Sequence, residues 1–175
     1  MPNDTRAQHV PSPPAAPPAS STMPLPRGEP LIEFTCRGRQ SEIRPALARL
    51  RGCLERHSAG NLEDVIDSVE IALAEVLNNI VEHAGPSGRR TAIRISVCGT
   101  NAGLAIRVSD DGRPMPGLLL PDGTGPDLAV PLADLPEGGF GWGIVHALTC
   151  ALHYRRAHGR NELALCFACQ GADGA

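Results

Sequence analysis

The sequence IALAEVLNNIVEHA, at residues 71–84, carries three polar side chains at a regular spacing within a mostly apolar run. Glu75, Asn79 and His83 recur every four positions, so on a helix they form one stripe that drifts by about 40° per step. The apolar residues around them predict a helix that is buried on most sides. A carboxylate and an amide in such surroundings need polar partners.

Two interpretations of this stripe stay open from the residues alone. It is either the solvated edge of an amphipathic helix or part of a site. In a site, the side-chain carbonyl of Asn79 would suit a hard cation such as Mg²⁺, and Glu75 would orient or deprotonate a nucleophile. His83 alone is more often a cap or a packing residue than a ligand.

Apolar periodicity predicts the elements and their order along the whole chain. We expect strands at residues 31–36, 91–98, 104–109, 151–156 and 161–169, and helices through 43–54, 61–84 and 142–152. Residues 111–140 are rich in Gly, Pro and Asp, and a loop of that length is usually functional or disordered. This order predicts an α/β (α+β) fold, with one sheet and the helices on one of its faces.

Length and composition are typical of one globular domain. The chain has 175 residues, 42% hydrophobic and 20% charged, with a net charge of −3. Residues 1–30 hold nine of the 17 prolines, so we expect a disordered tail there and a folded domain over 31–172. The lack of a basic block argues against nucleic acid as a partner. With no membrane-length apolar run and no secretory signal pattern, the chain is expected to be cytoplasmic and to have no membrane partner.

Two further segments have the composition of ligand-binding loops. Asp110 and Gly112 come where a strand ends. A fixed carboxylate there can accept a hydrogen bond from an exocyclic amine such as that of adenine, and glycine lets the backbone approach a flat base; an ordinary Asp-Gly turn is the alternative. The sequence GGFGWGIV, residues 138–145, opens a helix, where free N–H groups and the helix dipole favour phosphate. A glycine-rich hinge is the alternative for that segment.

Taken in order, three motifs resemble the nucleotide-binding boxes of the GHKL ATPase/kinase superfamily. They are Glu75-x-x-x-Asn79-x-x-x-His83-Ala84, Asp110-x-Gly112-x-Pro114 and Gly139-x-Gly141-x-Gly143-Ile144. The short distance between the first two, together with Tyr154 and the later Asn161-Glu162-Leu163, is similar to the stand-alone anti-sigma serine-protein kinases of the RsbW type. The resemblance implies the Bergerat fold, a two-layer α/β sandwich with a mixed, mostly antiparallel sheet.

The same resemblance implies ATP and Mg²⁺ as cofactors and gives each motif a role. Asn79 would coordinate Mg²⁺, Glu75 would act as the catalytic base, and Asp110 would bind the adenine amine beside Gly112. The other ATP-binding positions that it implies are His83, Pro114, Gly139, Phe140, Gly141, Trp142 and Gly143, with residues 115–138 as a lid. Members of the family bind a sigma factor and phosphorylate a STAS-domain anti-anti-sigma factor, and a homodimer is common among them.

Three other functions remain open on the sequence. Some positions depart from the residues common in the family, namely Pro114, Phe140 and Trp142. A module that binds ATP and sequesters a partner without phosphotransfer therefore fits the same motifs. A detached histidine-kinase catalytic domain would need an upstream phosphorylatable histidine, for which only His9 and His57 are present. A metal or redox site would use Cys166 and Cys169, although cysteines in an apolar strand are usually structural.

Overall fold

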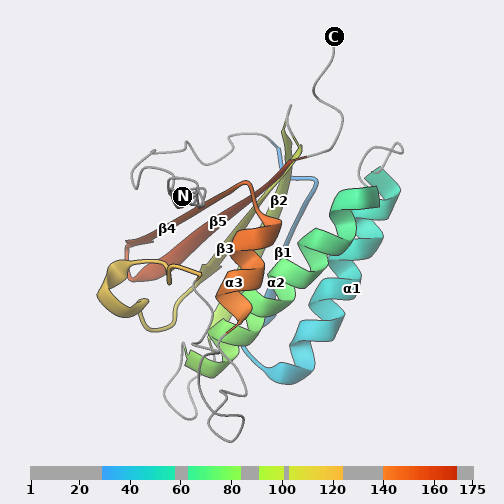
Figure 1. Cartoon of the computed structure of the whole chain (residues 1–175). Coiled ribbons are helices and arrows are strands. Elements are labelled where there is room, and N and C mark those ends of the chain that lie inside the picture. The colour runs from blue at the N-terminus through green and yellow to red at the C-terminus, as the bar shows by residue number, and fades with distance from the viewer. Residues whose placement is uncertain (1–28, 58–62, 84–90, 101–102, 124–139, 169–175) are drawn as a thin grey trace, which may run out of the picture.

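Five strands and three α-helices form two layers (Figure 1). The computed structural model describes residues 29–57, 63–83, 91–100, 103–123 and 140–168. In chain order the elements are β1 (Ile32–Arg37), α1 (Gln40–His57), α2 (Glu63–His83), β2 (Ala92–Thr100), β3 (Gly103–Asp110), the 3₁₀ turn η1 (Pro116–Leu118), α3 (Gly141–Leu148), β4 (Ala151–Ala157) and β5 (Arg160–Ala168).

The strands form one sheet in the order β1-β2-β3-β5-β4. Each neighbouring pair is antiparallel, so the described sheet lacks the parallel pairing of a mixed sheet. The three helices lie on the same face of the sheet, with α3 beside α2 (Figure 1). The predicted two-layer α/β sandwich with its helices on one face is confirmed.

The pairing of β3 with β5 brings two polar residues together at one end of the sheet. Asp110, the last residue of β3, lies opposite Asn161, and Val108 lies opposite Leu163. The turn between β4 and β5 has only two residues, His158 and Gly159, with φ of 52° and 76°. Two positive φ angles are the mark of a type I′ turn, whose twist matches that of the strands and fixes their register.

The core lies between the helices and the inward face of the central strands. Leu54, Val69 and Leu73 from α1 and α2, and Ile95 and Leu165 from the sheet, are all 0% exposed. Burial of each such side chain contributes about 1.5–3 kcal/mol to stability. Because the apolar face of α2 packs against this core, the direction in which its polar stripe faces is fixed.

The last helix is shorter than the periodicity predicts. The sequence favours a helix to residue 152, but α3 ends at Leu148. Thr149 is already extended, its hydroxyl donating to the Val145 carbonyl at 2.8 Å. The N–H of Cys150 donates to the carbonyl of Cys166 on β5 at 2.9 Å. Joining the sheet therefore overrides the helical pattern after residue 148.

Some predictions concern residues outside the described ranges. The predicted tail at 1–30 falls there except for Glu29 and Pro30, which are exposed, and the domain limits 31–172 stay a prediction. The start of the second helix at Asn61 and its end near Ala84 also fall outside; α2 is described from Glu63 to His83. Within the described residues, no helix is both long enough and apolar enough to span a membrane.

Candidate functional site

A pocket of about 580 Å³ lies between α2, α3 and the adjoining ends of β3, β4 and β5. Among the residues predicted from the motifs, its lining includes Asn79, His83, Asp110, Pro114 and Trp142. The other lining residues are mostly apolar: Val76, Ile80, Val108, Arg113, Met115, Pro116, Pro121, Tyr154, Asn161 and Leu163. Small-molecule sites typically measure about 300–1,000 Å³ and combine apolar walls with a few polar groups. The pocket has the size and composition of such a site.

Asp110 is the buried carboxylate of this pocket, with 4% of its surface exposed. Its Oδ1 accepts hydrogen bonds from the N–H of Gly112 at 2.8 Å and from Nδ2 of Asn161 at 2.9 Å. Burial raises the pKa of Asp110 above its usual value of 3.8, against the opposing effect of these two hydrogen bonds; Asp111 adds to the rise and Arg156 opposes it. The carboxylate still has acceptor capacity for an amine of a ligand.

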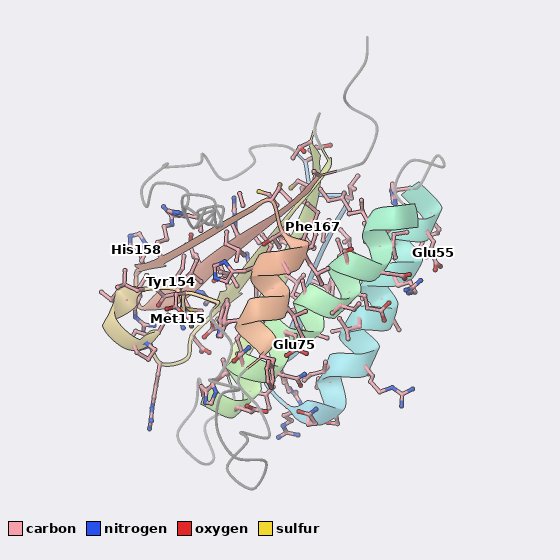
Figure 2. All side chains as sticks on the ribbon, viewed as in Figure 1. Glu55, Glu75, Met115, Tyr154, His158 and Phe167 are labelled. Atoms are coloured by element: carbon pink, nitrogen blue, oxygen red, sulfur yellow. The ribbon has the colours of Figure 1, made fainter. Side chains whose placement is uncertain are left out.

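The loop after Asp110 is held by residues from the C-terminal hairpin. Asn161 donates from Nδ2 to the carbonyl of Arg113 at 2.8 Å. The Tyr154 hydroxyl donates to Oδ1 of Asn161 at 2.8 Å and accepts from the N–H of Met115 at 3.1 Å. Figure 2 shows Tyr154 and Met115 next to each other at this end of the sheet.

Sequence reasoning assigned no role to Asn161 or Tyr154, which entered only as part of the family resemblance. A usable signal was present in the strand pattern. Asn161 occupies an inward position in the alternation that continues with Leu163, Leu165 and Phe167. A polar side chain in an apolar row must have buried partners, and the row ends beside Asp110.

On α2, the side chain of Asn79 is held by a hydrogen bond, whereas that of His83 is largely exposed. Nδ2 of Asn79 donates to the backbone carbonyl of Glu75 at 2.8 Å. Because a carbonyl only accepts, the NH₂ group must face it, and Oδ1 of Asn79 is left for a ligand. His83 is the last residue of α2 and lines the pocket. Its side chain is 74% exposed, and its Nε2 lies 3.8 Å from Oε2 of Glu82.

Glu75 lies beside the start of α3, as Figure 2 shows. A Cβ atom on Gly141 would lie 2.6 Å from Oε2 of Glu75 and 3.6 Å from Nδ2 of Asn79. Position 141 therefore has no room for a side chain while Glu75 keeps its place. The structure brings Glu75, Asn79 and Gly141 together.

The N-terminus of α3 has backbone donors without partners inside the helix. Phe140 precedes the helix with no side-chain cap and is 41% exposed. The first backbone bond runs from the N–H of Ile144 to the carbonyl of Phe140 at 3.0 Å. The N–H groups of Gly141, Trp142 and Gly143 thus precede it and, with the helix dipole, favour an anion. The predicted Gly139 lies outside the described residues.

The cysteines do not gather into a metal site in the described structure. Within those residues, no group of three His, Cys, Asp or Glu side chains is placed to hold a metal ion. Cys150 donates from Sγ to the backbone carbonyl of Cys166 at 3.3 Å, and both are free thiols. Cys169 lies outside the described residues, so the pair with Cys166 that the alternative metal or redox site would use is not placed.

The chain has sequence similarity to a curated protein kinase and matches two solved structures. Serine/threonine-protein kinase BtrW of Bordetella bronchiseptica strain RB50 is 34% identical over 94 residues, which are 52% of this chain and 62% of BtrW. The chain therefore spans less than two thirds of that relative's length. The solved RsbU and RsbW domains of Rv1364c from Mycobacterium tuberculosis match with a TM-score of 0.49 and 17% identity, over 77% of this chain and 31% of that one.

A second solved structure, the histidine kinase domain of the blue-light activated histidine kinase from Erythrobacter litoralis EL346, has a TM-score of 0.44 and 17% identity. The match covers 74% of this chain and 62% of that one. The model of the histidine kinase-like ATPase domain matches residues 36–167, from β1 to β5. The chain belongs to the histidine kinase-like ATPase domain family.

Proposed function

We propose that the protein is an ATP-dependent serine/threonine-protein kinase that acts as a cytoplasmic anti-sigma factor. It would phosphorylate a STAS-domain anti-anti-sigma factor and sequester a sigma factor when that antagonist is phosphorylated. The observation that carries the proposal is one pocket with a buried carboxylate at one end and, at the other, Asn79 next to Glu75 and the start of α3. The sequence identity of 34% over 94 residues with a serine/threonine-protein kinase supports the proposed activity.

At the sheet end of the pocket, Asp110 would accept a hydrogen bond from the exocyclic amine of adenine. Both described bonds to Asp110 end on Oδ1, so Oδ2 is the oxygen proposed to face the base. The apolar walls of Val76, Val108 and Leu163 suit a flat aromatic ring. Gly112 keeps the adjoining backbone free of a side chain.

At the helix end, the N–H groups of α3 would bind the phosphates of ATP. Oδ1 of Asn79 is an oxygen donor of the kind that Mg²⁺ prefers, and its amide is already fixed by Glu75. The residues present therefore fit Mg²⁺, which would neutralise charge on the phosphates when bound. Phosphate contacts from Gly139, Phe140 and Trp142 and a lid over residues 115–138 stay part of the proposal.

In the proposed step, the hydroxyl oxygen of a serine on the antagonist attacks the γ-phosphorus of ATP. The bond between that phosphorus and the bridging oxygen of ADP breaks, and the hydroxyl proton passes to the carboxylate of Glu75. The products are phosphoserine and ADP. Glu75 is half-buried beside Gly141, so it can act on a hydroxyl that approaches the start of α3.

Labelled ATP tests this function directly. The protein is incubated with γ-labelled ATP, Mg²⁺ and each purified STAS-domain protein of the source organism. We expect one of them to acquire label on a serine or threonine, and its alanine variant at that residue to acquire none. ATP binding without label on any of these proteins would instead support a sequestering module that lacks phosphotransfer. Absence of ATP binding would overturn both functions.

The raised pKa of Asp110 predicts how ATP affinity depends on pH. The amine donor favours the ionised carboxylate, so affinity is full above the pKa of the free protein and falls as the pH drops through it. Because burial raises that pKa, the loss should begin at a higher pH than for an ordinary aspartate. Titrations of the wild type and of Asp110→Asn over the same pH range measure this. Protonation of ATP itself affects both proteins, so an identical profile for the two would contradict the prediction.

A further inference from the structure

Asn161 has an unusual place in the pocket, because it is buried and fully hydrogen-bonded. It is 6% exposed. Its NH₂ group donates to Oδ1 of Asp110 at 2.9 Å and to the carbonyl of Arg113 at 2.8 Å. Its Oδ1 accepts from the Tyr154 hydroxyl at 2.8 Å and from Nη1 of Arg156 at 2.6 Å. Both N–H groups and both lone pairs of the amide are therefore in use.

This pattern allows only one orientation of the amide. If the amide were flipped, its oxygen would face two acceptors, the carboxylate of Asp110 and the carbonyl of Arg113. Its NH₂ group would then face the donating side chains of Tyr154 and Arg156. Asn161 lines the pocket, yet it has no hydrogen-bonding atom left for a ligand. Any effect on a ligand must pass through its partners.

The same hairpin also holds the backbone of the loop that follows Asp110. Nη1 of Arg156 donates to the carbonyl of Gly112 at 3.1 Å, and the Tyr154 hydroxyl accepts from the N–H of Met115. This loop lacks secondary structure between Asp110 and η1, so its polar backbone groups need outside partners. The hairpin supplies these partners, and the shape of the pocket at this end depends on them.

We propose that Asn161, held by Tyr154 and Arg156, is a positioning residue that sets the base preference of the pocket by holding Asp110 as a pure hydrogen-bond acceptor. An ionised carboxylate accepts from the amine of adenine but cannot donate to the carbonyl that replaces it in hypoxanthine. The N–H of Asn161 stabilises the ionised form and fixes one oxygen. Without that N–H, the carboxyl can rotate and bind a proton, and it can then donate to a carbonyl as well.

The inference rests on the proposed function and is tested with two nucleotides, ATP and ITP. Their bases differ at that edge alone: in ITP a carbonyl replaces the exocyclic amine, and the adjoining ring nitrogen N1 carries a proton. Trp142 is the single tryptophan of the chain and lines the pocket, so its fluorescence can report binding. We expect the wild type to bind ATP at least about tenfold more tightly than ITP, as for a hydrogen bond to a charged group. In Asn161→Ala the ratio should fall to within about threefold.

Glu162→Gln is the matched control. Glu162 follows Asn161 on the same strand and pairs with Arg155 across the hairpin at 2.5 Å. The variant weakens the hairpin without touching Asp110, so its ATP-to-ITP ratio should equal that of the wild type. If Asn161→Ala does not fold, Tyr154→Phe decides. This variant keeps the ring but removes the hydroxyl that donates to Asn161 and accepts from Met115. Its ratio should fall below that of the wild type.

The outcomes separate this inference from the proposed function. A wild type that binds neither nucleotide overturns the proposed function itself. If the wild type prefers ATP and Asn161→Ala keeps that preference, only the role of Asn161 is overturned. Where Asn161→Ala does not fold, an unchanged preference in Tyr154→Phe has the same meaning. An equal fall of the ratio in Glu162→Gln would attribute the effect to hairpin stability and would likewise overturn it.

Discussion

Glu75→Gln is expected to lower the rate of phosphotransfer to the antagonist by about 10²–10⁴-fold, the usual contribution of a general base. Glutamine keeps the shape of the side chain beside Gly141 but cannot take up the proton of the attacking hydroxyl. Because Glu75 is not part of the pocket lining, the affinity for ATP should change little. Transfer of label from γ-labelled ATP and a separate nucleotide titration measure the two quantities.

Glu82→Gln serves as the control for this variant. Glu82 lies on the same helix, and its side chain is 66% exposed, so the rate should stay that of the wild type. Full activity in Glu75→Gln would show that another group takes the proton. A parallel loss of ATP affinity and rate would place Glu75 in binding instead of in the chemical step.

Asn79→Ala is expected to remove the gain in ATP affinity that Mg²⁺ provides. The variant loses the oxygen whose direction is set by the bond from Nδ2 to the carbonyl of Glu75. Even partners one step beyond a metal ligand are worth about 10–100-fold in metal affinity or activity, so the loss should be at least that large. Titrations with ATP in Mg²⁺ and in EDTA measure the gain for each protein.

The neighbouring Asn78 offers a close control. Its Oδ1 accepts from Nε2 of Gln40 on α1 at 3.3 Å, and Asn78 is not part of the pocket lining. Asn78→Ala should therefore keep the gain from Mg²⁺. If Asn79→Ala also keeps it, the cation is bound elsewhere and the assignment of Asn79 is wrong.

The sequence was most informative where the prediction depended on spacing within a single helix. The four-residue spacing of Glu75 and Asn79 predicts a shared face, and the structure places them one turn apart with a direct bond. The two layers also follow from the order of the elements, because helices must cover the apolar face of the sheet. Local periodicity was less reliable at residues 149–152, where the pairing with β5 ends the helix early.

The contacts around Asn161 could not be predicted from the sequence, because they depend on how distant strands pair. Asn161 and Asp110 are 51 positions apart in the chain, and their meeting depends on the register of β3 with β5. An alternating strand shows which residues share a face, but not which residue of a distant strand lies opposite. The role of Asn161 therefore becomes visible only once the sheet is assembled.

The two-residue turn at His158 and Gly159 links the surface of the protein to its interior. A slip of one residue at this turn would exchange the faces of β5. In one direction of the slip, Glu162 would lie where Asn161 now lies, and a second carboxylate would face Asp110. The tip of an exposed hairpin is usually a tolerant place for insertions. In this protein its length determines which residue of β5 lies opposite Asp110 in the pocket.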